Sequence, residues 1–254
     1  MNLLEKGSKL NKTLFIIPCF NEEKRFDKNR WLIFIDSVDK KSDFLFVDDG
    51  STDGTKKILG SIENGERIKM RSNSINLGKG RSIRDAILRS INDYESFCFI
   101  DADWATSEMD ILNIKSKFDS DVDLDVIIGS RIETASSHIN RKFYRYAIGR
   151  FFAFVVNFFL QPKMYDSQAG IKIFRNTLYF TKSIALTKGY RWTFDLELIA
   201  TLFKIKKNHN LTFSIIEFPL NSWTDVGKSK VTIIGGLLSF FEIIKIKMDL
   251  NKIN

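Results

Sequence analysis

Two carboxylates separated by one residue, Asp101 and Asp103, are the side chains of this chain best suited to chemistry. They follow the apolar run 96–100, which predicts a buried strand that ends where the acids begin. Because a charged group is costly to bury, carboxylates at a strand end need a cation or hydrogen bonds. Mg2+ prefers one or two carboxylates together with substrate phosphates. The pair is therefore a candidate site for Mg2+ or Mn2+, although Asp-x-Asp also occurs in ordinary loops.

A second pair of acids, Asp48 and Asp49, follows the apolar run 44–47. The spacing does not fit a calcium-binding EF-hand, because Gly60 stands where a bidentate Glu is needed. A turn with a helix cap explains the residues after the pair, but not two consecutive acids at the end of an apolar strand. Since carboxylates only accept hydrogen bonds, one of the two is suited to the imino N–H of a nucleobase.

Gly78 and Lys79 precede an amphipathic helix predicted for 80–91. The surrounding sequence is not a P-loop, because the first glycine and the Ser or Thr after the lysine are missing. Glycine allows a phosphate to approach and Lys79 supplies a counter-charge, but a tight turn with a solvated lysine fits equally well. Arg131 follows the strand predicted for 126–129 and presents a planar fork suited to phosphate oxygens, a weak signal by itself.

The elements that must position these residues alternate between strands and helices. Short apolar runs predict buried strands at 13–17, 44–47, 68–71, 97–100 and 126–129, with helical patterns between them. This order predicts an α/β fold with a mostly parallel sheet and helices on both faces. Ligands of such sheets bind beyond the carboxyl ends of the strands, which is where the polar motifs lie. The first half of the chain is therefore predicted to bind a nucleotide.

The second half contains two strongly apolar helical segments. The run 151–160 is too short to span a bilayer and is flanked by basic residues that include Arg141 and Arg145. The helix predicted for 231–250 has Leu238, Phe241 and Met248 on an apolar side, and Ser239, Glu242 and Asp249 on a polar side. Both segments fit a membrane interface with basic groups toward anionic headgroups. Packing against the domain or a second subunit is an equal alternative for the last helix.

Composition narrows the class of protein. The chain has 254 residues. Its net charge of +8 favours an anionic partner, and its 23 Phe residues are compatible with a membrane-facing surface. Nucleic acid is not expected, because the Lys and Arg residues form no stripe with interleaved aromatics. Cys19 and Cys98 lie in apolar strands, which predicts a reducing compartment such as the cytoplasm rather than a disulfide scaffold.

The sequence does not predict a zinc site, a Ser-His-Asp triad, a signal peptide or a membrane-spanning helix. With only two His and two Cys, zinc ligation and a Ser-His-Asp triad have little support. The polar residues 1–12 do not form a signal peptide, and no window of 18 uninterrupted apolar residues predicts a membrane-spanning helix.

Eight motifs occur in order along the chain. They are Ile-Pro-Cys-Phe-Asn-Glu-Glu (17–23), Val-Asp-Asp-Gly-Ser-Thr-Asp-Gly-Thr (47–55), Asn-Leu-Gly-Lys-Gly (76–80), Asp-Ala-Asp (101–103), Gly-Ser-Arg (129–131), Asp-Ser-Gln-Ala-Gly-Ile-Lys (166–172), Arg-Trp-Thr-Phe-Asp-Leu-Glu-Leu (191–198) and Gly-Lys-Ser-Lys-Val (227–231). In this order and spacing the chain resembles family 2 glycosyltransferases of the polyprenyl-phosphate type over about residues 13–231. Within that family it looks most like the dolichyl-phosphate β-glucosyltransferases. Mannosyl relatives usually have Gln where this chain has Ala105, which leaves a third metal ligand in doubt.

The resemblance implies a glycosyltransferase A fold, that of nucleotide-diphospho-sugar transferases, with a mostly parallel mixed sheet. It implies a catalytic domain over 1–228, with a nucleotide-sugar half at about 1–130 and an acceptor half at about 131–228. An amphipathic C-terminal helix would follow over 229–254. The residues implied around the nucleoside are Pro18, Asn21, Glu22, Asp48 and Asp49.

The resemblance also implies roles at the phosphates. Asp101 would lie near the ribose or the metal, and Asp103 would bind the Mg2+ or Mn2+ that bridges the diphosphate. Arg131, with either Arg141 or Arg145, would meet the acceptor phosphate. Lys230 would hold phosphate from a closing loop.

The expected activity is the inverting transfer of a hexose onto a polyprenyl phosphate such as dolichyl or undecaprenyl phosphate, with UDP-glucose favoured as donor. A phosphate monoester has a second pKa of about 6, so the acceptor is largely ionised at neutral pH and no general base is required. The enzyme is expected at the cytosolic face of a membrane as a peripheral protein, and an oligomer is compatible with the sequence.

Two alternatives stay open. A glycosyltransferase of surface polysaccharide synthesis, with a sugar hydroxyl as acceptor, would need a catalytic carboxylate, for which Asp166 and Asp195 are the candidates. A non-catalytic protein would bind the nucleotide sugar without turnover of any acceptor.

Overall fold

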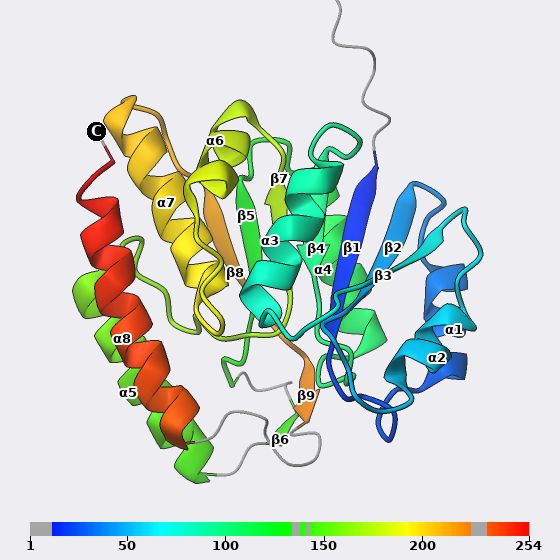
Figure 1. Cartoon of the computed structure of the whole chain (residues 1–254). Helices are drawn as coiled ribbons and strands as arrows, with labels where there is room; N and C mark the ends of the chain where they lie inside the picture. The colour runs from blue at the N-terminus through cyan, green and yellow to red at the C-terminus, as the bar shows by residue number, and fades with distance from the viewer. Residues whose placement is uncertain (1–11, 134–137, 141–142, 225–232, 254) are drawn as a thin grey trace, which may run out of the picture.

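A seven-stranded mixed sheet forms the centre of the computed structural model, which describes residues 12–133, 138–140, 143–224 and 233–253 (Figure 1). The strand order is β3-β2-β1-β4-β7-β5-β8. β7 (Lys172–Arg175) runs antiparallel to its neighbours β4 (Ser96–Phe99) and β5 (Val126–Ser130), and the other pairings are parallel. This mostly parallel sheet with helices on both faces confirms the fold class expected from the sequence.

The first half of the chain supplies one edge of the sheet through crossover connections. β1 lies between β2 and β4, with Cys19 opposite Asp48 and Ile16 opposite Phe99. The loops that follow these three strands therefore meet at one end of the sheet. The elements of this half, besides β4, are β1 (Thr13–Cys19), α1 (Lys28–Ser37), β2 (Ser42–Asp48), α2 (Thr55–Gly60), β3 (Ile68–Ser72) and α3 (Lys79–Ser90).

Beyond β4 the same sheet continues through β7, β5 and β8. A separate two-stranded sheet pairs β6 with β9 in parallel. The remaining elements are α4 (Glu108–Ser120), β6 (His138–Asn140), α5 (Phe143–Phe159), α6 (Leu178–Leu186), α7 (Phe194–Asn208), β8 (Ile215–Pro219), β9 (Ser222–Thr224) and α8 (Ile233–Leu250).

Two hydrophobic clusters cover the two faces of the sheet. In β1, Leu14 and Ile16 face the cluster shared with α3, α5, α6, α7 and α8, whereas Phe15 and Ile17 face the cluster shared with α1, α2 and α4. Burial on both faces explains why this strand reads as a continuous apolar run rather than as an alternating one.

Helix α1 begins at Lys28, several residues after β1 ends at Cys19. Asn21 has a φ of 50°, and its Oδ1 accepts a hydrogen bond from the backbone N of Thr52 at 2.9 Å. The backbone N of Glu22 donates to Thr55 Oγ1 at 2.7 Å. These contacts hold the residues after β1 on the loop after β2, so the helix starts only after Asp27 caps it.

Helices α5 and α8 lie side by side at one edge of the molecule and begin at the end of the sheet where β1 and β4 finish (Figure 1). Ile243, Ile246 and Leu250 of α8 are buried in the cluster around α7. No helix within the described ranges is long and apolar enough to cross a membrane.

Candidate functional site

A pocket of about 390 Å³ lies at the carboxyl ends of β1 and β4 and is closed on its far side by the segments before β7 and α7. Its lining includes eight of the residues singled out from the sequence, namely Pro18, Glu22, Asp49, Lys79, Asp101, Asp103, Arg131 and Asp195. Four others do not line the pocket. Gly78 and Asp166 form hydrogen bonds with the lining residues Asp49 and Arg131. Asn21 and Asp48 form hydrogen bonds with Thr52 and Ser51 in the loop after β2. The whole of Arg141 and of Lys230, and the side chain of Arg145, lie outside the described residues.

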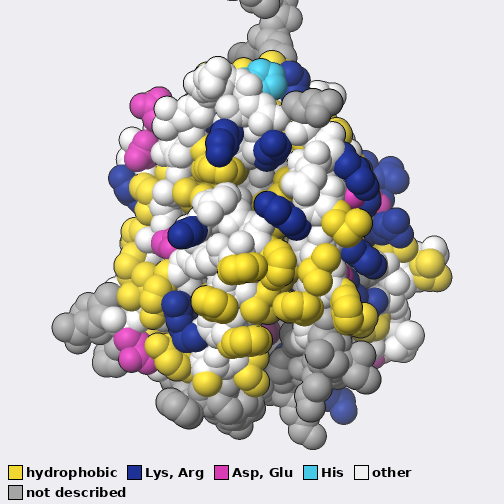
Figure 2. Space-filling model, turned by 90° about the vertical axis from the view of Figure 1, so that its left-hand side faces the viewer, with side chains coloured by type: hydrophobic (Ala, Val, Ile, Leu, Met, Phe, Trp, Pro, Cys, Tyr) yellow, Lys and Arg dark blue, Asp and Glu magenta, His cyan; other side chains and the backbone are white. Residues whose placement is uncertain are grey.

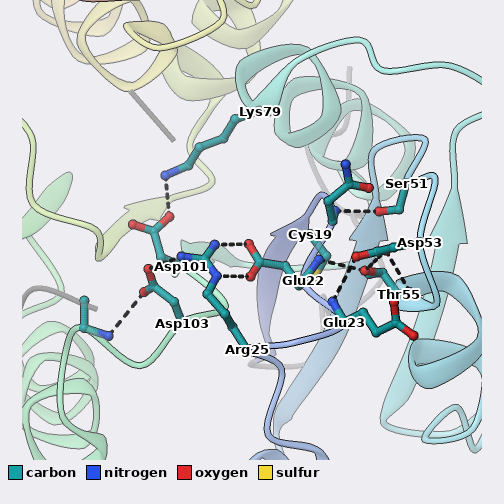
Figure 3. A network of polar contacts seen from close by, with 12 residues as sticks. Cys19, Glu22, Glu23, Arg25, Ser51, Asp53, Thr55, Lys79, Asp101 and Asp103 are labelled. Carbon is teal, nitrogen blue, oxygen red and sulfur yellow. Dashed lines mark hydrogen bonds and ion pairs between the residues drawn. The ribbon is translucent and has the colours of Figure 1, made fainter. Parts of the chain in front are cut away.

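The two carboxylates after β4 lie between two basic side chains (Figure 3). Lys79 Nζ donates to Asp101 Oδ1 at 2.5 Å. Asp103 accepts a hydrogen bond from the backbone N of Ala105 at 3.2 Å, and its Oδ2 lies 3.9 Å from Nη1 of Arg25. The arrangement places fixed positive charge on both sides of the acidic pair.

Arg25 is a pocket residue that the sequence analysis does not identify. Its Nε and Nη2 bind the two carboxylate oxygens of Glu22 at 2.9 and 2.7 Å. Glu22 is 6% exposed, so this fork orients the guanidinium from a rigid base. The only sequence signal for the contact is the spacing of three residues between the two, which is typical of a helical turn.

The electrostatics of the acidic pair favour a cation. Burial and then repulsion by Asp101 raise the pKa of Asp103 above its usual range. Among the residues that the structure describes, no group of three or more His, Cys, Asp or Glu side chains could hold a metal ion. Two carboxylates still suit Mg2+ or Mn2+, because such ions take their remaining ligands from phosphate oxygens and water. The residues present therefore fit a divalent ion that binds together with a phosphorylated ligand.

The acids after β2 have different partners. Asp49 lines the pocket, and its two carboxylate oxygens accept from the backbone N of Leu77 and of Gly78, both at 2.8 Å. This fixes the turn that presents Lys79, where Gly78 has a φ of 95°. Asp48 accepts from the backbone N of Ser51 at 3.0 Å and holds its own loop instead.

Arg131 is bound by Asp166 at the pocket wall. Its Nε and Nη2 donate to the carboxylate at 2.6 and 2.7 Å, and its guanidinium lies 5.0 Å from the ring centre of Trp223. Burial opposes ionisation of Asp166, but the hydrogen bonds and charge of Arg131 outweigh it and lower the pKa of Asp166 to about 2.

The start of α7 contributes an ion pair. Asp195 lies 2.6 Å from Nζ of Lys172, which also donates to the backbone O of Ala169 at 2.6 Å. Glu197 turns away from the pocket and accepts from the backbone N of Lys188 at 2.6 Å. The two acids thus point in different directions, as their spacing on a helix predicts.

Several pocket residues escape sequence reasoning because the fold, not the local sequence, brings them in. Lys172 comes from the antiparallel β7, and Arg191 comes from the segment before α7. The signal available in the sequence is that these residues lie in the motifs 166–172 and 191–198.

Comparisons with known proteins found relatives in sequence and in fold. A family model described as Glycosyl transferase family 2 matches residues 14–187. Dolichyl-phosphate beta-glucosyltransferase of Homo sapiens is 28% identical over 233 residues, which cover 85% of this chain and 68% of the relative. The enzyme of the same name from Drosophila melanogaster is 29% identical over 232 residues, which cover 85% of this chain and 68% of the relative.

Solved structures share the fold. Glucosyl-3-phosphoglycerate synthase from Mycobacterium tuberculosis, in complex with Mn2+, UDP-glucose and phosphoglyceric acid, has a TM-score of 0.66 at 14% identity and covers 96% of this chain and 81% of that chain. TarS 1-349 of S. aureus has a TM-score of 0.55 at 16% identity and covers 84% of this chain and 60% of that chain.

Proposed function

The chain belongs to glycosyl transferase family 2, and on that premise we propose that it transfers a hexose from a nucleotide sugar to a polyprenyl phosphate. UDP-glucose is the favoured donor, dolichyl or undecaprenyl phosphate the acceptor, and the product is the inverted, β-linked sugar. The names of the curated relatives support glucosyl transfer to a lipid phosphate. One observation carries the proposal: an acidic pair at a strand end, set between Lys79 and Arg25 in a single pocket.

In this proposal Asp103, with Asp101, holds Mg2+ or Mn2+ in the donor site. A bound divalent ion supplies charge that stabilises the nucleoside diphosphate as it leaves. Lys79 and Arg25 supply fixed positive charge at the same place, which costs no reorganisation during the reaction. A fold neighbour crystallised with Mn2+ and UDP-glucose supports this choice of ligands.

The nucleoside would lie over the ends of β1 and β2, in a nucleotide-sugar half at about residues 1–130. Pro18, Glu22 and Asp49 line that part of the pocket. Asn21 and Asp48 act indirectly, because their hydrogen bonds shape the two loops.

The acceptor half, about residues 131–228, would present Arg131 to the lipid phosphate, with Arg145 and Lys230 as further candidates. Asp166 keeps Arg131 in place. A carboxylate whose pKa is about 2 is a weak base at neutral pH, so Asp166 is poorly suited to deprotonate a sugar hydroxyl. Asp195 already forms an ion pair with Lys172. Both observations favour an ionised phosphate acceptor over the sugar-hydroxyl alternative.

The outer surface of α5 and α8 supports contact with a membrane. Figure 2 shows hydrophobic side chains gathered on this face with Lys and Arg around them. On α5, Phe151, Phe154 and Phe158 are 68%, 66% and 74% exposed. Such a contiguous apolar face with basic residues fits the interface of an anionic bilayer. We assign the protein to the cytosolic side as a peripheral enzyme.

The test is a screen of donors and acceptors with the full chain in detergent. UDP-glucose, UDP-galactose and GDP-mannose are each supplied with polyprenyl phosphate or with an oligosaccharide, and release of UDP or GDP is measured with MnCl2 or MgCl2. We expect UDP release that requires polyprenyl phosphate and the metal, and that yields polyprenyl-phosphate-glucose by mass spectrometry. Transfer to the oligosaccharide alone would establish the hydroxyl alternative. Binding of UDP-glucose without turnover of either acceptor would establish a non-catalytic binder.

A further inference from the structure

Helix α8 is attached to the pocket wall by one acidic side chain. Glu242 accepts hydrogen bonds from the backbone N of Arg191 at 3.1 Å and from Thr193 Oγ1 at 2.8 Å, with a longer one from the backbone N of Trp192 at 3.4 Å. A single carboxylate therefore binds three consecutive residues of the segment that leads into α7.

A second acid of α8 binds the residues just before these. Asp249 accepts from the hydroxyl of Tyr190 at 3.0 Å and lies 2.7 Å from Nζ of Lys188. Glu197 of α7 holds the same segment from the other side through the backbone N of Gly189 at 3.1 Å. The segment 188–193 is thus fixed between α7 and α8.

The segment also lies directly against the turn that carries Lys79. The backbone N of Gly80 donates to the backbone O of Arg191 at 3.2 Å. A Cβ placed on Gly80 would lie 1.9 Å from the backbone O of Tyr190, so the two segments approach each other as closely as glycine allows. Since Arg191 and Trp192 line the pocket, a shift of this segment would change both the pocket wall and the surroundings of Lys79.

Helix α8 has an inner side, which is attached to the segment 188–193, and an exposed outer side. Its inner side is mixed, with Ser239 only 5% exposed beside the buried Ile243 and Ile246, whereas Leu238, Phe241 and Met248 are 52%, 58% and 57% exposed. Lys245 and Lys247 are exposed as well. Both acids of the helix are used on the inner side, which leaves the outer side apolar and basic.

We infer that Glu242 is a positioning residue that couples the lipid-facing helix α8 to the pocket wall at 191–193. This inference rests on the proposed function. Contact of the outer side of α8 with a bilayer restrains the helix, and Glu242 passes that restraint to Arg191, Trp192 and Thr193. The acceptor side of the pocket is then held more firmly when the enzyme is at the surface that holds its lipid substrate.

The experiment compares the full-length wild type with E242A and E242Q, and uses E66A and E66Q as controls. Glu66 is exposed and outside the pocket lining, so its variants reproduce the chemical change at a neutral place. Vesicles of phosphatidylcholine and phosphatidylglycerol are added without polyprenyl phosphate, and hydrogen exchange of the backbone amides is followed by mass spectrometry. Vesicle binding is measured separately by sedimentation.

We expect vesicles to slow exchange in α5, α8 and 188–193 of the wild type and of the Glu66 variants. In E242A, slowing should persist in α5, α8 and 188–190, which Asp249 and Glu197 still hold, and disappear in 191–193, with E242Q intermediate because its amide oxygen keeps one acceptor. With polyprenyl phosphate in the vesicles, kcat/KM for the acceptor should fall roughly tenfold in E242A, while the Kd for UDP with Mn2+ changes little.

Two results would overturn the inference. One is slowing of 191–193 in E242A equal to that in the wild type. The other is vesicle binding by the wild type that protects α8 and leaves 188–193 unchanged. Neither result depends on turnover, so failure of the proposed function is seen separately, as a wild type that produces no polyprenyl-phosphate sugar.

Discussion

Nη1 of Arg25 lies 3.9 Å from Oδ2 of Asp103, although the two side chains come from the loops after different strands. Glu22 holds the same guanidinium through two hydrogen bonds. Asp103 therefore has a fixed positive neighbour before any ligand binds, and burial together with Asp101 raises its pKa. Asp103 is therefore placed to interact with both the ion and the phosphate that the pocket is proposed to bind.

Asp103→Asn should remove the metal site and most of the activity. The amide keeps the shape of the side chain but not its charge, so transfer should fall by about 10²–10³. Mn2+ binding in the presence of UDP, followed by electron paramagnetic resonance, should weaken in parallel. Asp36→Asn, an exposed change on α1, is the matched control and should behave as wild type. Full turnover by Asp103→Asn would remove the acidic pair from the reaction.

Arg25→Met tests whether the arginine acts on the fold or on the reaction. Alone it leaves the buried Glu22 without its fork and should lower the free energy of unfolding by about 1–3 kcal/mol. The double variant Arg25→Met, Glu22→Gln should regain most of that stability, because the remaining side chain is neutral.

Turnover should stay low in the double variant, since the positive charge beside Asp103 is still missing. Urea unfolding and kcat measured on the same preparations separate the two effects. Activity that returns together with stability would assign Arg25 a purely structural role.

The sequence is sufficient to predict strands β1 to β5 and the end of the sheet where the site lies. Buried parallel strands are short continuous apolar runs, as in β1 and β2, and their carboxyl ends are fixed by topology. Asp101 and Asp103 could be placed there because the acids directly follow such a run. Pocket residues whose position depends on distant pairing, such as Lys172 on the antiparallel β7, could not be found in this way.

The orientation of α8 is the clearest case that sequence could not decide. Periodicity separates an apolar side from a polar one, but it does not say which side faces the protein. Glu242 turns inward because the segment before α7 offers backbone donors there, and the apolar Ile243 and Ile246 turn inward beside it. Likewise, Asp49 is an acid suited to a nucleobase by its chemistry, yet its oxygens also hold the turn at Gly78.

Gly170→Ala should disturb Asp101 without unfolding the protein. A Cβ at this position would lie 2.6 Å from Asp101 Oδ2, so the carboxylate must move away and its ion pair with Lys79 must lengthen. We expect kcat to fall roughly tenfold or more. Thermal unfolding should change by only a few degrees. Gly60→Ala, where the nearest atom is 3.9 Å away, is the control. Unchanged kcat in Gly170→Ala would show that the position of Asp101 is not important.

The pair of Asp166 and Arg131 should make stability depend on acid pH. The folded pKa of Asp166 is about 2, below the ordinary value of 3.8, so its ionised form stabilises the fold. That contribution, about 2 kcal/mol, is complete above about pH 4 and is lost as the pH falls toward 2. Asp166→Asn should therefore be less stable than wild type at pH 7 by urea unfolding, with the difference shrinking between pH 4 and pH 2. A difference that stays constant over that range would contradict the ionic origin of the effect.

The outward phenylalanines of α5 should bind lipid and contribute little to folding. Phe151, Phe154 and Phe158 are 66–74% exposed, so replacing all three by Ser removes apolar area that the fold does not bury. Transfer of such side chains into a bilayer interface is favourable, and the triple variant should bind vesicles at least about tenfold more weakly. Its unfolding temperature and its Kd for UDP should match the wild type.

The matched control replaces Ile33, Met109 and Val122 by Ser. These residues are 72%, 64% and 73% exposed and belong to the opposite face of the sheet or the loop beside it. Since both triple variants lose similar apolar exposure, a general effect of hydrophobicity would weaken both equally. Weaker binding by the control alone would move the membrane contact to the face of α1 and α4, and the coupling through Glu242 would lose its basis.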